Sequence, residues 1–130
     1  MADHPNATLI RKGYEAFSAG DVATLTELIA PDAVQHMPGH NRFSGDHRGV
    51  QNILAMYGQL AELTGNTFRV DLEEVYANDD TVVTVYHATG DRGDKHLDNR
   101  HALVFTMRDG HAVELNDIAT DSEADDKFWA

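Results

Sequence analysis

The chain has 130 residues, enough for one domain with a substantial core, and 42% of them are apolar. Ten Lys and Arg stand against 22 Asp and Glu, and the resulting net charge of −12 argues against a nucleic-acid partner, because such binding depends on neutralising phosphates. No apolar run approaches the roughly 20 residues of a membrane span, no secretory leader is evident and cysteine is absent, so we expect a cytoplasmic protein that has no membrane partner.

The first half of the chain is predicted to be mainly helical. Apolar residues recur at helical spacing over residues 5–19, 22–30 and 50–63, and each of these segments predicts a helix with one apolar face. Between the second and third helices, residues 33–37 predict a short strand and residues 40–49 a polar loop.

The second half is predicted to form a sheet. Four segments rich in strand-forming residues follow one another, over 67–77, 81–90, 97–107 and 111–119, and a short helix is predicted over 122–129. Helices gathered ahead of a meander predict an α+β fold, in which a curved antiparallel sheet wraps around the N-terminal helices. We expect one domain that spans the whole chain.

Polar residues interrupt the apolar face of two predicted strands. Because side chains alternate between the faces of a strand, Asn99 and His101 share the face that carries the large apolar residues of 97–107. Asp117 is likewise in phase with Leu115. Burying polar groups costs free energy unless they are paired, so this pattern predicts the wall of a small-molecule cavity.

Several segments resemble the SnoaL-like branch of the NTF2-like superfamily. They are YEAFSAGDVATLTELIAPDAV, HMPG followed by FSGDHRG, LDNR ahead of one strand, and RDGHAVE ahead of the last strand. The resemblance covers roughly residues 8–129. It implies a cone-shaped cavity between helices and sheet, and a homodimer formed through the sheet. The superfamily contains ketosteroid isomerases, polyketide cyclases, epoxide hydrolases, dehydratases and binding modules, so fold alone does not decide function.

The resemblance also implies roles for individual residues. His36 falls at or beside the general-base position on the first short strand, Asp117 near an acidic residue of the last strand, and Tyr14 at a hydrogen-bonding position of the first helix. A His36–Asp117 pair would move one proton, while Tyr14, Asn99 and His101 orient a substrate oxygen. Four apolar or aromatic residues are expected first as ordinary core residues and second as lining of the cavity: Phe17, Met37, Tyr57 and Phe105.

Structural alternatives remain open for the polar residues. His36 could bond to the loop at 38–45, Asp117 could lie exposed at a fraying strand, and Asn99 and His101 could satisfy each other or the backbone. No metal-ligand spacing and no nucleotide-binding motif is present, so we expect neither a metal nor another cofactor.

The expected function is therefore a cofactor-independent acid/base enzyme. It would be an isomerase, cyclase or dehydratase that acts on a small, largely apolar carbonyl or polyketide-like substrate. Two alternatives are a non-catalytic carrier that uses the same cavity and a protein-association module whose interior is filled.

Overall fold

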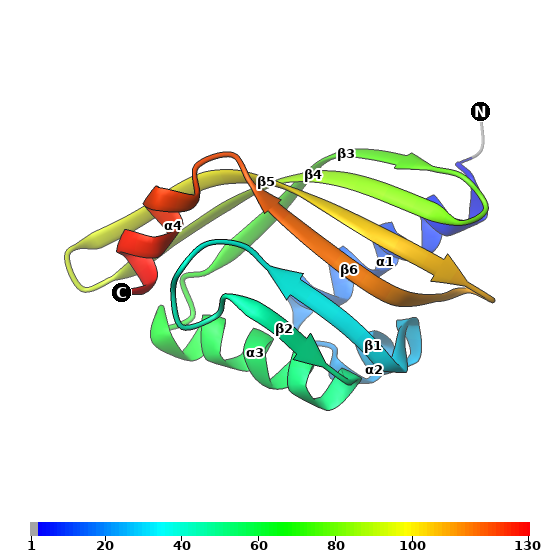
Figure 1. Ribbon diagram of the computed structural model, residues 1–130, viewed down its shortest axis with the longest axis horizontal. Helices are drawn as coiled ribbons and strands as arrows, with labels where there is room; N and C mark the ends of the chain where they lie inside the picture. The colour runs from blue at the N-terminus through cyan, green and yellow to red at the C-terminus, as the bar shows by residue number, and fades with distance from the viewer. Residues whose placement is uncertain (1–2) are drawn as a thin grey trace.

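The computed structural model describes residues 3–130. An open, curved six-stranded sheet lies over α1, α2 and α3, and α4 lies at one end of the sheet (Figure 1). The strand order is β2-β1-β6-β5-β4-β3. The elements are α1 (Pro5–Ala19), α2 (Val22–Leu28), β1 (Ile29–Met37), β2 (Gly45–Arg48), α3 (Val50–Leu63), β3 (Arg69–Ala77), β4 (Thr81–Arg92), β5 (Lys95–Arg108), β6 (His111–Ala119) and α4 (Ser122–Trp129). The predicted α+β class is confirmed.

Local sequence explains how the first two helices begin and end. Pro5 occupies the first turn of α1, and Gly20 follows its last residue with a φ of 69°, a left-handed conformation that glycine adopts without a steric penalty. Asp21 caps α2 by accepting a hydrogen bond from the backbone N–H of Thr24. α2 ends two residues earlier than predicted, because the chain enters β1 already at Ile29.

β1 differs most from its prediction. It is longer than the expected strand at 33–37, and its pairing with β6 is parallel, whereas the other strand pairs are antiparallel. The β1–β6 register is irregular between Ile29 and Val34, the stretch that contains Pro31. β2 was predicted as loop, because a strand of four residues with mostly polar side chains carries no strand signal.

The faces of the central strands decide which side chains reach the interior. The odd-numbered residues of β5 from 97 to 107 are all buried, as the alternation predicts. On β6, Leu115 and Asp117 are buried. On β1 the buried residues are Ile29, Ala30, Ala33 and Gln35. No helix within residues 3–130 is long and apolar enough to cross a membrane.

Candidate functional site

A cavity of about 110 Å³ lies between the sheet and the helices beneath it. Its wall is mostly apolar and is built from all four helices and from strands β1, β3, β4, β5 and β6. The expected site residues that line it are Tyr14, Phe17, Met37, Tyr57, His101, Phe105 and Asp117.

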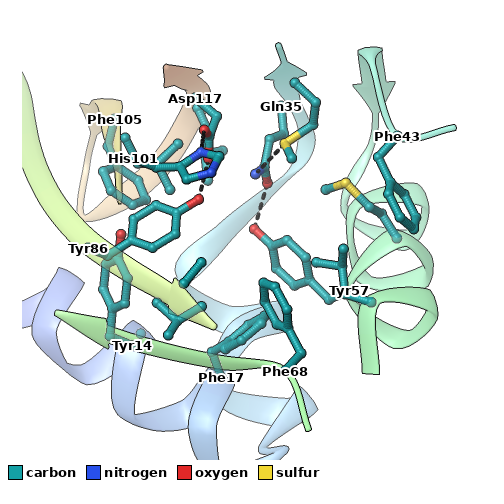
Figure 2. Close-up of a pocket in the computed structure, with 18 of the residues that line it drawn as sticks. Tyr14, Phe17, Gln35, Phe43, Tyr57, Phe68, Tyr86, His101, Phe105 and Asp117 are labelled. Carbon is teal, nitrogen blue, oxygen red and sulfur yellow. Dashed lines mark hydrogen bonds and ion pairs between the residues drawn. The ribbon is translucent and has the colours of Figure 1, made fainter. Parts of the chain in front are cut away.

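Three side chains from adjacent strands meet at one wall of this cavity. The Asp117 carboxylate on β6 has one oxygen 2.5 Å from Nδ1 of His101 on β5. Its other oxygen accepts a hydrogen bond of 2.6 Å from the Tyr86 hydroxyl on β4. The Tyr86 ring also stacks on the imidazole, with ring centroids 5.1 Å apart (Figure 2). Asp117 is therefore held in a fixed orientation by two donors.

The far side of His101 is bound by the C-terminal helix. Its Nε2 lies 3.0 Å from Oδ2 of Asp125 on α4. Asn99 donates to the other Asp125 oxygen at 3.0 Å and to the carbonyl of Asp121 at 2.9 Å. Asn99 does not line the cavity; instead it holds Asp125 in place. We call His101, Asp117, Asp125 and Tyr86 the His101 network.

The two carboxylates decide the charge of His101. Burial alone would lower the pKa of the imidazole, but the hydrogen bonds and charges of Asp117 and Asp125 outweigh burial and raise it from 6.5 to about 9. His101 is therefore an imidazolium at neutral pH, and each ring nitrogen donates to a carboxylate. Burial and the neighbouring Asp117 raise the pKa of Tyr86 well above 10, so Tyr86 stays protonated and remains a donor.

Two further tyrosines bring hydroxyl groups to the cavity from the helices. The Tyr14 hydroxyl on α1 lies 2.7 Å from Oγ1 of Thr84. The Tyr57 hydroxyl on α3 donates to Oε1 of Gln35 at 2.6 Å. Burial raises the pKa of both tyrosines above 10, so both hydroxyls keep their protons at neutral pH.

His36 does not face the cavity, and the expectation that it would do so is wrong. Its ring lies on the opposite face of β1, where Nδ1 is 2.5 Å from Asp46 and Nε2 is 2.9 Å from Glu114, and the side chain is 32% exposed. The reason is the strand's phase: in the second half of β1 the residues Ala33, Gln35 and Met37 share the inward face, so Gln35 takes the interior position.

Sequence reasoning missed Gln35, Tyr86 and Asp125. For Gln35 and Tyr86 no clear signal existed, because both faces of their strands carry apolar residues. The burial of Asp125 could have been predicted from its spacing to two aromatic residues. Asp125 precedes Phe128 and Trp129 by three and four residues, so all three share one helix face, and the two aromatic residues mark that face as the buried one. Within residues 3–130, no cluster of three or more His, Asp and Glu side chains is arranged to hold a metal ion.

The comparison with protein families decides the assignment. Residues 10–115 match the model described as the SnoaL-like domain. The chain belongs to this family. The family match confirms the resemblance to SnoaL-like proteins that the sequence motifs indicated.

Similar proteins span the whole domain. An uncharacterised protein of Mycobacterium tuberculosis (strain ATCC 25618 / H37Rv) is 37% identical over 131 residues, covering all of both chains. The solved structure of Bal32a, from a soil-derived mobile gene cassette, is 38% identical with a TM-score of 0.94 and covers 97% of each chain. IdmH of Streptomyces antibioticus, whose structure is described as that of a candidate polyketide cyclase, is 25% identical with a TM-score of 0.75. The match covers 90% of this SnoaL-like chain and 93% of the IdmH chain.

Proposed function

We propose that this SnoaL-like protein is a cofactor-independent acid/base enzyme that moves a proton on a small, largely apolar carbonyl compound. The observation that carries the proposal is the position of the His101 network, whose paired charged groups form one wall of an otherwise apolar cavity. Such groups are costly to bury, and perturbed titratable groups in a cavity are typical of acid/base sites. The family membership and the likeness to IdmH support isomerase, cyclase or dehydratase chemistry.

Asp117 is the proposed general base. Its carboxylate takes a proton from a carbon next to the substrate carbonyl, and the electron pair left behind is delocalised onto the carbonyl oxygen as an enolate. Return of the proton to a different carbon completes an isomerisation, and no oxidant or reductant is needed. His101 and Tyr86 orient Asp117 throughout, and the imidazolium stabilises its charge beside an otherwise apolar wall.

The cavity volume limits the size of the substrate. At about 110 Å³ it is comparable to cavities of about 150 Å³ that hold benzene. A single-ring carbonyl compound fits this space, whereas a fused multi-ring polyketide would require the wall to move. Cyclohexanone and 3-cyclohexen-1-one are therefore suitable probes.

The test is carbon-acid chemistry on these probes. Nuclear magnetic resonance would follow deuterium exchange into cyclohexanone in D₂O, and ultraviolet absorbance would follow conversion of 3-cyclohexen-1-one to its conjugated isomer. We expect Asp117→Asn to lower both rates by roughly 10²- to 10⁴-fold. His36→Gln is the matched control, because His36 also bridges two carboxylates but lies outside the cavity, and it should leave both rates unchanged. A wild-type rate no higher than that of Asp117→Asn would refute the proposal.

A non-catalytic carrier is the second candidate. One observation favours it: no buried polar side-chain atom within residues 3–130 lacks a hydrogen-bond partner, as expected of a rigid wall that takes no part in chemistry. A carrier would bind cyclohexanone and retain its affinity in Asp117→Asn, and it would catalyse no exchange in either form.

A further inference from the structure

The Gln35 amide of the cavity wall has a strong hydrogen bond at its oxygen and only a weak one at its nitrogen. The side chain is only 3% exposed and points inward from β1 (Figure 2). Its Oε1 accepts the hydrogen bond from Tyr57, but its Nε2 is paired with the thioether sulfur of Met37 at 3.4 Å. A thioether is a weak acceptor, so the two N–H groups of a buried amide are left nearly unused.

The orientation of this amide follows from its partners. Turning the amide over would place Oε1 against the Met37 sulfur, which has no hydrogen to donate. With Oε1 on Tyr57, each end has a partner of the correct type, and Nε2, whose partner is only the weak sulfur acceptor of Met37, can exchange it for a stronger acceptor. A carbonyl oxygen is such an acceptor.

We propose that Gln35 Nε2 binds the carbonyl oxygen of the substrate while Asp117 acts on a neighbouring carbon. This inference rests on the proposed function and assigns the oxygen-binding half of the same site. β1 and β6 are paired with Gln35 opposite Leu115, so Asp117 lies two residues further along on the same face. Spacing between and along strands puts the two Cα atoms about 8 Å apart. Both side chains line the same cavity, so one small ligand can contact both.

The charges around the cavity restrict the ligand to a neutral carbonyl compound. Among residues 3–130, no Lys or Arg lines the cavity. The one cation in its wall, His101, is already bound by Asp117 and Asp125. A carboxylate ligand would meet two carboxylates with no free cation to offset them, whereas a ketone, ester or lactone needs only a neutral donor such as Gln35.

The test measures the bound carbonyl directly, with cyclohexanone labelled with ¹³C at its carbonyl carbon. Hydrogen bonding moves this resonance downfield, and we expect that shift on binding to the wild-type protein. Tyr57→Phe should retain it, because Nε2 is unchanged. The double variant Gln35→Met/Tyr57→Phe replaces both ends of the pair with apolar groups of similar size, and it should lose the shift and bind cyclohexanone roughly 2- to 13-fold more weakly.

Two ligands of similar shape provide a measurement that needs no variant. The wild-type protein should prefer cyclohexanone to methylenecyclohexane, and it should bind cyclohexanecarboxylate more weakly than either. Loss of the carbonyl shift in Tyr14→Phe but not in the double variant would overturn the assignment, as would equal affinity for the ketone and the alkene. These binding results are independent of turnover. Retained exchange in Asp117→Asn would instead count against the proposed function and leave the role of Gln35 standing.

Discussion

His36 and His101 each bridge two carboxylates, from opposite faces of one sheet. The partners of His36 are Asp46 and Glu114, in a solvent-accessible cluster, and those of His101 are Asp117 and Asp125, which are buried. The two clusters have the same chemical groups and differ mainly in burial. They therefore separate the effect of the cavity environment from that of the ion pairs themselves.

His101→Gln should destabilise the protein far more than His36→Gln. Removing the buried imidazolium leaves two carboxylates without their cation, and breaking a buried ion pair in this way typically costs about 3–5 kcal/mol. When His36 is removed, water screens the two remaining carboxylates. His36→Gln should therefore lower the free energy of unfolding less than His101→Gln does. Urea denaturation at pH 7 measures both free energies of unfolding. Equal losses would contradict this prediction.

The stability of the protein should fall as the pH rises from 6.5 to 9. The pKa of His101 is raised from 6.5 to about 9 on folding, so the folded protein binds this proton more tightly than the unfolded chain does. This stabilisation is complete below pH 6.5 and is lost as the pH rises through 9. Over that range the free energy of unfolding should fall by a few kcal/mol. The measurement is best made in His36→Gln, because hydrogen bonds with Glu114 and Asp46 raise the pKa of His36 as well. Adding His101→Gln should remove this fall.

Tyr86→Phe should lower the exchange rate by less than roughly tenfold. The substitution removes the 2.6 Å hydrogen bond to Asp117 but retains a ring to stack on His101. Asp117 keeps its contact with the imidazolium of His101, so it loses only one of the two donors that orient it. The measurement is deuterium exchange into cyclohexanone at pH 7. A loss of rate as large as that in Asp117→Asn would contradict this supporting role of Tyr86.

Trp129→Ala should enlarge the cavity and admit a two-ring ligand. The Trp129 ring lines the cavity and packs edge-on against Phe43, with centroids 4.9 Å apart. Truncation should cost about 3–5 kcal/mol of stability and allow 2-tetralone to bind, as measured by nuclear magnetic resonance titration. Phe128→Ala is the matched control: Phe128 is buried on the same helix but does not line the cavity, so this change should destabilise the protein without admitting 2-tetralone.

The homodimer that the family resemblance implies stays a prediction. On the sheet face opposite the cavity, Ile118 is 53% exposed and lies beside Ala102, and Val104 follows on the same face of β5. A second copy that covers this face would bury these apolar side chains. Light scattering should give the mass of a dimer for the wild-type protein and that of a monomer for Ile118→Lys. A wild-type monomer would contradict the expectation.

Strand periodicity predicted the part of the site that lies on β5 and β6. His101 and Asp117 each share a face with large apolar residues, and this alternation is visible without knowledge of the neighbouring strands. The two side chains then meet because β5 and β6 pair with Leu103 opposite Asp117, a register that the Asp-Gly turn between the strands favours.

The inward residue of β1 could not be predicted in the same way. Val34 and His36 share one face, Ala33 and Gln35 share the other, and each set mixes apolar with polar groups. The choice depends on how β1 joins β6, a parallel contact between segments about 80 residues apart in sequence. Asp125 was missed for another reason: an acidic segment is usually solvated, and its spacing to Phe128 and Trp129 was the one indication of burial. The ion pair with His101 makes that burial favourable.

The irregular start of β1 also bears on how this cavity could diversify. A one-residue slip of a strand exchanges its two faces. Gain or loss of a single codon in the irregular stretch between Ile29 and Val34 would therefore turn the imidazole of His36 inward and the side chains of Gln35 and Met37 outward, while the wall residues on the other elements stay in place. One mutational event would thus exchange a neutral donor for a titratable group in the cavity wall.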